Sequence, residues 1–387
     1  MSPLPVLRGF DVQEYKARVA RAQSAMASAQ LDALLLTTEP ELRYFTGFLT
    51  RFWESPTRPW FLVVPAAGDP IAVIPSIGAH LMGQSWIDDI RTWRSPDLED
   101  DGLSLLAETL RDVLPAQARI AIPDGHETHV RMPWADLQYL SQSVLPMVLT
   151  GDQGILRALR LVKSPAEIEK IRQTCGIAAR AFERVPEIAS TGVELSQVFR
   201  QFQCLCLQEG ADWVAYLAGG AGRGGYRDVI SPAGDIPLAK GDVLMLDTGV
   251  VLDGYFCDFD RNFAVGPVAQ ASLDAHARLI EATHAGFAAA RPGASAADLF
   301  HAMDQVLTGG AGGSDAGRYG HGLGLQLTEW PSLIPGDHTR LEVGMVLTLE
   351  PGLQVAPGVT LVHEENIHIT PTGADWLTEP AKDMIRI

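Results

Sequence analysis

The chain carries two near copies of a short apolar segment that ends in a carboxylate. The first, residues 241–249, has the sequence GDVLMLDTG and contains Asp247, and the second, residues 344–352, has the sequence GMVLTLEPG and contains Glu350. Continuous apolar runs of this length, closed by a glycine, are typical of buried strands. Each strand therefore delivers one acid from an apolar environment, where a carboxylate needs a partner.

Each copy is followed by a second acid at a similar distance, and a histidine lies between the copies. The second acids are Asp258 and Glu364, and the histidine is His321. The spacing of Asp247 and Asp258 predicts two adjacent antiparallel strands with both acids on one face. Four clustered carboxylates repel each other unless cations lie between them, and the nearby cation in the sequence is Arg261. Four acids and an imidazole therefore favour a site for two hard divalent metal ions over a salt bridge.

The charge balance argues against nucleic acid and anionic membranes as partners. The 387 residues include 30 basic and 47 acidic side chains, a formal net charge of −17, and no basic run offsets it. Four cysteines, Cys175, Cys204, Cys206 and Cys257, do not suggest a secreted disulfide scaffold. We expect reduced thiols and a cytoplasmic protein, because residues 1–5 contain no apolar signal segment and no apolar run approaches the length of a membrane span.

The length suits two domains, and residues 1–152 are predicted to form a small α/β domain. Apolar residues recur at helical spacing between residues 11 and 29. The further predicted elements are strands at residues 33–36, 60–64, 71–74 and 120–122 and a helix near residues 103–113. The segment 151–154 (GDQG) marks the break, so residues 153–387 form the second domain.

The second domain repeats the order helix, helix, hairpin. Its first long helix starts at a capping box, Ser164-Pro165-Ala166-Glu167. The other predicted features are helices at residues 195–208, 273–290 and 296–307 and glycine-rich segments at residues 219–225 and 309–317. We expect the glycine segment 219–225 to be a mobile rim of the pocket. A repeat of about a hundred residues is too long for a solenoid, and it would place the two acid-bearing strands face to face about a pseudo-twofold axis.

Five short motifs occur at the predicted strand ends and turns. They are Asp247-Thr248-Gly249, Cys257-Asp258-Phe259-Asp260-Arg261, His321-Gly322-Leu323-Gly324, Leu349-Glu350-Pro351-Gly352, and Glu364 before Thr370. Together they resemble the pita-bread metallopeptidases, the family of prolidase, aminopeptidase P, methionine aminopeptidase and the non-peptidase creatinase. Residues 11–150 resemble the N-terminal domain that prolidase, aminopeptidase P and creatinase share. The resemblance implies an α+β fold, in which a smaller creatinase-type α/β domain precedes a C-terminal pita-bread domain with a pseudo-twofold repeat.

The resemblance also implies that all five metal positions of the family are filled, which is not so in creatinase. These positions are Asp247, Asp258, His321, Glu350 and Glu364. Glu365 adjoins Glu364, and the spacing to Thr370 assigns the ligand to Glu364. Two divalent ions, Mn²⁺ before Co²⁺, Fe²⁺ or Zn²⁺, would share a hydroxide and polarise a scissile carbonyl. Glu350 and His321 would act catalytically, with Glu350 carrying the proton from the nucleophile to the leaving nitrogen.

The chain departs from this family at positions that handle the substrate. Prolidase and aminopeptidase P have a histidine about seventeen residues before the first metal aspartate and another seven residues after the metal histidine, and these positions are Ile230 and Thr328 here. Their loss removes hydrogen-bond donors to the carbonyl and the tetrahedral intermediate. Val362 and His363 replace the usual arginine before the last glutamate, and Asp260 replaces a threonine. We therefore expect an intact metal site beside an altered proline-peptidase apparatus.

Several polar and aromatic residues near these positions are candidates for substrate contact. They are Asp260, Thr328, Glu329, Trp330 and His363, together with Arg51 and Trp53 of the N-terminal domain. We expect a homodimer, in which the segment around Arg51 and Trp53 would reach across to the neighbouring site.

The leading hypothesis is a metal-dependent hydrolase that resembles the Xaa-Pro peptidases. It would cleave an amide C–N bond of a short peptide or small molecule. Ile230 and Thr328 keep open a non-peptidase relative that hydrolyses an amidino or cyclic C–N bond of a small charged metabolite, or a lyase. A metal-free binding module is a third hypothesis, and five filled ligand positions argue against it.

Overall fold

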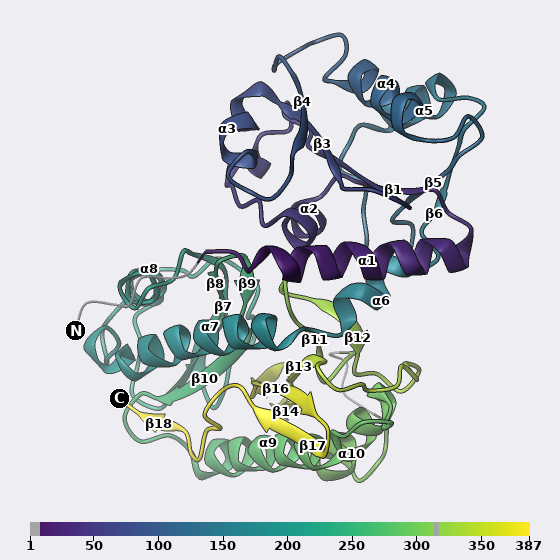
Figure 1. Cartoon of the computed structure of the whole chain (residues 1–387). Helices are drawn as coiled ribbons and strands as arrows, with labels where there is room; N and C mark the ends of the chain where they lie inside the picture. Colours follow the sequence, from purple (N-terminus) through teal and green to yellow (C-terminus); the bar gives the residue numbers. More distant parts are fainter. Residues whose placement is uncertain (1–7, 313–316) are drawn as a thin grey trace. The chain divides into compact units, whose positions relative to one another are not determined.

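The computed structural model describes residues 8–312 and 317–387, and its contacts divide the chain into two compact units (Figure 1). The first unit runs to Arg160, and the second begins at Leu161. Helix α6 (Ile155–Leu161) lies between the predicted boundary at residue 152 and this division. Residues 1–5 and part of the predicted glycine segment 309–317 lie outside the described residues. Within the described residues, no helix is long and apolar enough to cross a membrane.

The first unit is an α/β layer built on a sheet with strand order β4-β3-β2-β1-β5-β6. Its strands are β1 (Ala33–Leu36), β2 (Phe61–Pro65), β3 (Ile71–Pro75), β4 (Asp89–Trp93), β5 (Arg119–Ile122) and β6 (Val148–Gly151). Its helices are α1 (Val12–Ala29), α2 (Glu39–Thr46), α3 (Ala79–Met82), α4 (Leu103–Val113) and α5 (Trp134–Ser143), with 3-10 turns η1 (Phe52–Glu54) and η2 (Ser76–Gly78). Strands β1, β2 and β3 are buried along their whole length, as their continuous apolar sequences predict.

The described residues of the second unit form two five-stranded sheets, each of which carries one of the two acid-bearing hairpins, and a separate two-stranded sheet of β14 and β15. The first sheet has the order β18-β10-β8-β7 with β9 beside β8, and the second has the order β12-β11-β13-β16-β17. The strands of the first sheet are β7 (Trp213–Arg223), β8 (Asp242–Leu252), β9 (Tyr255–Phe256), β10 (Phe259–Ala264) and β18 (Ile385–Arg386). Those of the second are β11 (His321–Gly322), β12 (Glu329–Ser332), β13 (Val346–Leu349), β16 (Glu365–Thr370) and β17 (Gly373–Trp376), and β14 (Gly352–Ala356) pairs with β15 (Val359–Val362).

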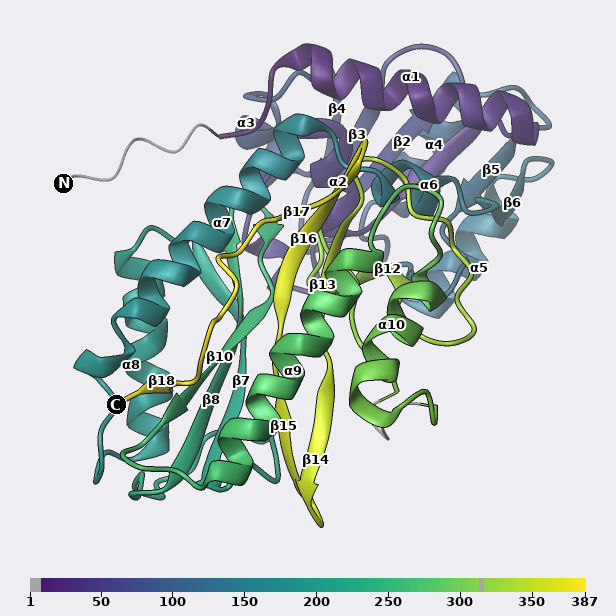
Figure 2. The same cartoon turned by 90° about the horizontal axis from the view of Figure 1, so that it is seen from below.

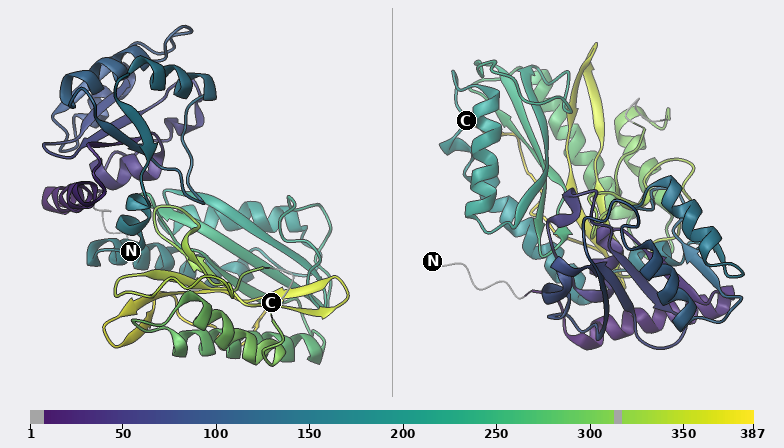
Figure 3. Two further views of the ribbon diagram at one scale, coloured as in Figure 1. Left: turned by 90° about the vertical axis from the view of Figure 1, so that its right-hand side faces the viewer. Right: turned by 90° about the horizontal axis from the view of Figure 1, so that it is seen from above.

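Two pairs of helices pack against these sheets. The helices are α7 (Pro165–Glu183), α8 (Leu195–Gln208), α9 (Gln270–Ala289) and α10 (Ala296–Thr308), with a 3-10 turn η3 (Val185–Glu187). Helix α7 contacts β8, and α8 contacts β7. Helix α9 contacts β13, β14, β15 and β17, and Figures 2 and 3 show it (green) running along the C-terminal strands (yellow) with α10 beside it. The order helix, helix, hairpin therefore occurs twice, and the predicted α+β fold is confirmed.

The predicted capping box at the start of α7 is confirmed. The hydroxyl of Ser164 accepts a hydrogen bond from the backbone N–H of Glu167, and the carboxylate of Glu167 accepts one from the backbone N–H of Ser164 at 2.9 Å. Pro165 occupies the first turn, where its missing N–H leaves no intrahelical bond unmade. These local contacts fix where α7 begins and therefore how its apolar stripe meets β8.

The prediction of a mobile rim at residues 219–225 is wrong, because residues 213–223 form the long strand β7. Gly219 adopts a φ of +141°, and a Cβ atom at this position would lie 2.1 Å from the backbone oxygen of Met245 in β8. The glycine therefore serves close packing of two strands. A sequence rich in glycine predicts a loop, and the pairing of β7 with β8 overrides that preference.

Replacing Gly219 with alanine is expected to destabilise the second unit by about 2–4 kcal/mol, because it adds an overpacked methyl group and a strained φ. The melting temperature should fall accordingly in calorimetry. Gly234→Ala is the matched control, since a Cβ atom at Gly234 would have no neighbouring atom within 4 Å and the residue has no positive φ. Equal melting temperatures for the two variants would contradict the packing role of Gly219.

Candidate metal centre

The two hairpins place their acids at corresponding positions. In the first hairpin, Asp247 lies inside β8 and Asp258 directly precedes the paired strand β10. In the second hairpin, Glu350 directly follows β13 and Glu364 directly precedes the paired strand β16. Each hairpin therefore supplies one acid from each of its two strands, as the repeated pattern predicts.

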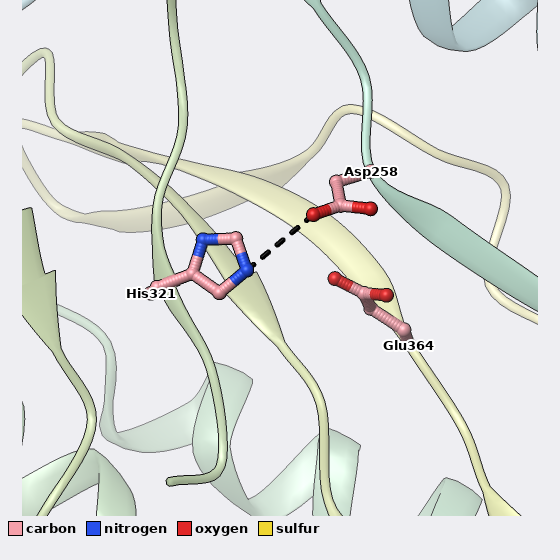
Figure 4. A group of neighbouring side chains, drawn as sticks. All are labelled: Asp258, His321 and Glu364. Atoms are coloured by element: carbon pink, nitrogen blue, oxygen red, sulfur yellow. Dashed lines mark ion pairs between the residues drawn. The ribbon is translucent and has the colours of Figure 1, made fainter. Parts of the chain in front are cut away.

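The structure brings an acid from each hairpin and the histidine between them into one buried group. Ligand atoms of Asp258, His321 and Glu364 all lie within 4.8 Å of one another, and Figure 4 shows the three side chains converging. Nε2 of His321 lies 3.4 Å from Oδ2 of Asp258 and 4.0 Å from Oε2 of Glu350. Asp247 belongs to the same group, because the charges of Asp258 and Glu350 act on its carboxylate.

The His321 ring is oriented with a lone pair toward the acids. Its Nδ1 lies 2.8 Å from the carbonyl oxygen of Gly322, which can only accept a hydrogen bond, so Nδ1 carries the proton of the neutral ring. Nε2 then faces the carboxylates of Asp258 and Glu350 as an acceptor. Hydrogen-bond acceptors that face one another at these distances are stabilised by a cation between them. A metal-binding histidine usually donates a hydrogen bond from its other ring nitrogen, as His321 does to Gly322.

Burial and mutual repulsion raise the pKa values of the clustered acids. Burial raises the pKa of Asp247, Asp258 and Glu364 well above the ordinary range, and neighbouring carboxylates raise the pKa of each further. Burial also raises the pKa of Glu350 to about 7, although the nearby His321 opposes this shift. Without a cation, the cluster therefore retains protons near neutral pH.

The buried oxygens of the cluster suit a divalent cation. Asp247 Oδ1 and Glu364 Oε1 are buried and have no hydrogen-bond partner among the described residues. Buried polar atoms without a partner are rare in folded proteins. Carboxylate oxygens with one imidazole are a ligand set for Mn²⁺, Co²⁺, Fe²⁺ or Zn²⁺, and Asp247, Asp258, His321, Glu350 and Glu364 are the residues that would hold such ions.

The adjacent Glu365 has a different environment from Glu364. Its carboxylate lies 3.2 Å from Nη2 of Arg261 and accepts hydrogen bonds from the hydroxyl of Thr378 and, at 2.8 Å, from the backbone N–H of Ala381. Consecutive residues at the start of a strand point to opposite faces. These contacts are consistent with the assignment of the ligand to Glu364, and they direct Arg261 toward Glu365.

Asp260 and His363, two of the predicted substrate contacts, form a buried pair behind the metal centre. Oδ1 of Asp260 accepts a hydrogen bond from the backbone N–H of Glu364 at 3.1 Å and lies 3.3 Å from Nδ1 of His363. Nε2 of His363 lies 3.3 Å from Oε1 of Glu365. Burial alone would lower the pKa of His363, but the two carboxylates raise it to about 9. The pair therefore holds the backbone at Glu364, and both side chains are buried.

The other predicted substrate contacts have varied surroundings. Glu329 is buried, where its carboxylate lies 2.9 Å from Nζ of Lys163 and accepts hydrogen bonds from the backbone N–H groups of residues 325 and 326. Trp330 is buried in the core of the second unit, and the half-buried Thr328 accepts a hydrogen bond at 3.3 Å from Arg318. Substrate contact by these residues stays a prediction.

Arg51 and Trp53 lie in the first unit. The side chain of Arg51 is 57 % exposed and pairs with Glu54, while the ring of Trp53 lies 5.9 Å from that of Trp60. A role for Arg51 and Trp53 at a site of a neighbouring chain also stays a prediction.

Three residues near the cluster were not identified from the sequence. Asn366 holds the backbone of Asp258, since its Oδ1 accepts from the Asp258 N–H at 3.1 Å and its amide donates to the Asp258 carbonyl. Tyr216 lowers the pKa of Asp247, which burial raises, and Arg318 acts electrostatically on Asp258. The sequence contains no signal for Asn366 or Tyr216, whereas Arg318 could have been noticed because it lies three residues before His321.

Two protein-family models match the chain. The model of metallopeptidase family M24 matches residues 169–371, and the model of the creatinase/prolidase N-terminal domain matches residues 18–162. Together they span both units. All five proposed ligands lie within the M24 match.

Curated relatives match the chain over most of its length. A probable dipeptidase, PepE, of Mycobacterium tuberculosis is 30% identical over 359 residues, which cover 89% of each chain. A putative dipeptidase, YkvY, of Bacillus subtilis is 26% identical over 370 residues, which cover 95% of this chain and 99% of the relative.

Solved structures share the whole fold. The dipeptidase PepE from Mycobacterium ulcerans superposes with a TM-score of 0.82 at 28% identity, covering 98% of this chain and 99% of that one. A prolidase from Thermococcus sibiricus superposes with a TM-score of 0.85 at 21% identity, covering 98% and 100%. At that identity the second likeness shows the fold alone.

Metal should stabilise the protein more strongly at higher pH. The pKa values of the clustered acids are higher in the folded chain than in the unfolded chain. In the metal-free protein, the protonated acids therefore stabilise the fold below about pH 4, and this stabilisation is lost as the pH rises. For Glu350 the loss occurs through about pH 7. Divalent ions compete with these protons. In EDTA, the melting temperature should therefore fall from pH 5 to pH 8. The difference between the melting temperatures with Mn²⁺ and with EDTA should become larger over the same range. A difference that becomes smaller toward pH 8 would contradict this account.

Disrupting the Asp260 and His363 pair should weaken metal binding. Asp260→Asn removes one of the two carboxylate charges beside His363. Residues that hold a metal ligand typically contribute about 10- to 100-fold in affinity. The Kd for Mn²⁺ from calorimetry should increase by that factor while far-UV circular dichroism is retained. His368→Gln is the control, because His368 lies on β16, the strand that follows His363, and its nearby acid is Asp375 instead. An unchanged Kd in folded Asp260→Asn would refute the positioning role.

Proposed function

The chain belongs to metallopeptidase family M24 and is a metal-dependent hydrolase, and we propose that it cleaves the amide bond of dipeptides. The observation that carries this proposal is the buried convergence of Asp258, His321 and Glu364 with Asp247 and Glu350 beside them. That ligand set suits two divalent ions. Relatives described as dipeptidases match nearly the whole chain, which supports a short peptide as the substrate.

The metal ions would be held by the four carboxylates and His321. When bound, divalent ions at such a site polarise the substrate carbonyl and lower the pKa of water. We propose Mn²⁺ as the first ion to test, followed by Co²⁺, Fe²⁺ and Zn²⁺, because a carboxylate-rich site with one imidazole accepts each of them. The homodimer and the cytoplasmic location inferred from the sequence stay predictions.

Glu350 is the residue best placed to move a proton. It lines a cavity of about 580 Å³, and its side chain is 30 % exposed, compared with 6 % for Asp258 and 3 % for His321. An accessible carboxylate at the edge of the cluster can accept a proton from the attacking nucleophile and deliver it to the leaving nitrogen. The backbone N–H of Glu350 donates to the carbonyl of Tyr319 at 3.0 Å, which fixes the main chain at this position.

A second candidate is hydrolysis of another C–N bond in a small charged molecule, or a lyase reaction. It is favoured by Ile230 and Thr328, which stand where prolidase and aminopeptidase P have histidines. Ile230 is 87 % exposed, and Thr328 contacts Arg318. Neither side chain can supply an imidazole to a proline-containing substrate, so Xaa-Pro dipeptides are expected to be poorer substrates than other dipeptides.

Protein reconstituted with Mn²⁺ should hydrolyse dipeptides such as Leu-Ala, and Glu350→Gln should lower kcat by about 10²- to 10⁴-fold because the proton carrier is lost. Product release measured by chromatography, with bound metal measured by elemental analysis, tests both points. Glu342→Gln is the control at an exposed glutamate. Rapid cleavage of Ala-Pro and Leu-Pro would exclude the second candidate, whereas no cleavage of any dipeptide by metal-loaded protein would refute the proposed function.

A further inference from the structure

The cavity beside Glu350 contains a positive charge that the roles described above do not use. The cavity has a volume of about 580 Å³ and is lined by Gly317, Arg318, Ile334, Glu350, Gly352 and Val362. Arg318 and Glu350 are the charged residues of this lining, and the others are glycine or aliphatic. Ligand sites are commonly apolar with a few polar groups that fix orientation, and this lining has that composition.

Arg318 has few partners of its own. Within residues 8–312 and 317–387, its guanidinium makes no ion pair and makes one hydrogen bond, from Nη2 to Oγ1 of Thr328 at 3.3 Å. A guanidinium carries five N–H donors. The side chain is half-buried, so donors remain available on the wall of the cavity.

The charge of Arg318 acts on the acid cluster without being neutralised by it. Burial raises the pKa values of Asp258 and Glu350, and Arg318 opposes both shifts. Neither acid comes within ion-pair distance of Arg318 in the described part of the chain. Two divalent ions would balance the four carboxylates of the centre, so the metal-loaded cavity would retain one uncompensated positive charge, on Arg318.

We propose that Arg318 binds a carboxylate group of the substrate, namely the free C-terminal carboxylate of a dipeptide. This assignment rests on the proposed dipeptidase function. The planar guanidinium matches a carboxylate with two parallel hydrogen bonds, which gives both affinity and orientation. Val362 and His363 replace the arginine that the pita-bread metallopeptidases usually have before the last glutamate. Val362 lines the same cavity and carries no charge. The guanidinium of this cavity comes instead from the segment before His321.

Paired ligands test this assignment. The reduced-peptide (CH2–NH) analogues of Leu-Ala and Leu-Ala amide differ only in the terminal carboxylate, and because they contain no scissile carbonyl, their binding to the Mn²⁺-loaded, otherwise unmodified protein can be measured by calorimetry. We expect the free acid to bind at least about 10-fold more tightly than the amide, since hydrogen bonds to charged groups contribute about 10- to 100-fold. Arg318→Met should abolish the preference, and Arg318→Lys should retain part of it.

Two controls show whether a loss of the preference comes from the contact with the carboxylate or from a change elsewhere in the protein. Arg291→Met, at an exposed arginine outside the cavity lining, should leave the preference intact. The Kd for Mn²⁺ should be nearly unchanged by Arg318→Met, because Arg318 is not a ligand. Equal weakening of acid and amide, no preference in the parent protein, or no binding of either ligand would overturn the assignment. If the preference is present but no dipeptide is hydrolysed by the otherwise unmodified enzyme, the carboxylate site stands and the proposed reaction fails.

Discussion

Mutual repulsion among buried carboxylates is the constraint on which the second unit depends. Two unit charges 4 Å apart interact by about 4 kcal/mol at the effective dielectric constant of a protein surface, and by more in its interior. In the described part of the chain, Arg261 pairs with Glu365 and Lys163 pairs with Glu329, and Arg318 acts on the cluster without forming an ion pair with it. We therefore expect metal binding to contribute to the stability of the fold as well as to its chemistry.

The sequence predicted those features that are encoded locally or by repetition. The doubled apolar segment with Asp247 and Glu350 located both hairpins, and the capping box at Ser164 located the start of α7. The resemblance to the pita-bread metallopeptidases is confirmed by the family matches. The imidazole of His321 was recognisable because it lies between the two repeats.

Features that depend on contacts between distant segments could not be predicted. Gly219 was assigned to a loop because glycine has no strand preference, and only the approach of the Met245 carbonyl explains its presence in β7. Asn366 adjoins the ligand region in sequence, but its contact with the Asp258 backbone depends on how two separate hairpins meet. Asp260 and His363 were noticed as substitutions, and their pairing required the fold.

The contacts behind the metal centre join one repeat to the other. Asp260 of the first hairpin accepts from the backbone of Glu364 in the second and neighbours His363, and Arg261 of the first pairs with Glu365 of the second. Neither repeat is therefore self-sufficient. Loss of Asp260 alone would leave Glu365 as the remaining carboxylate beside the buried imidazole of His363, so the charge balance behind the metal centre is shared between the two halves.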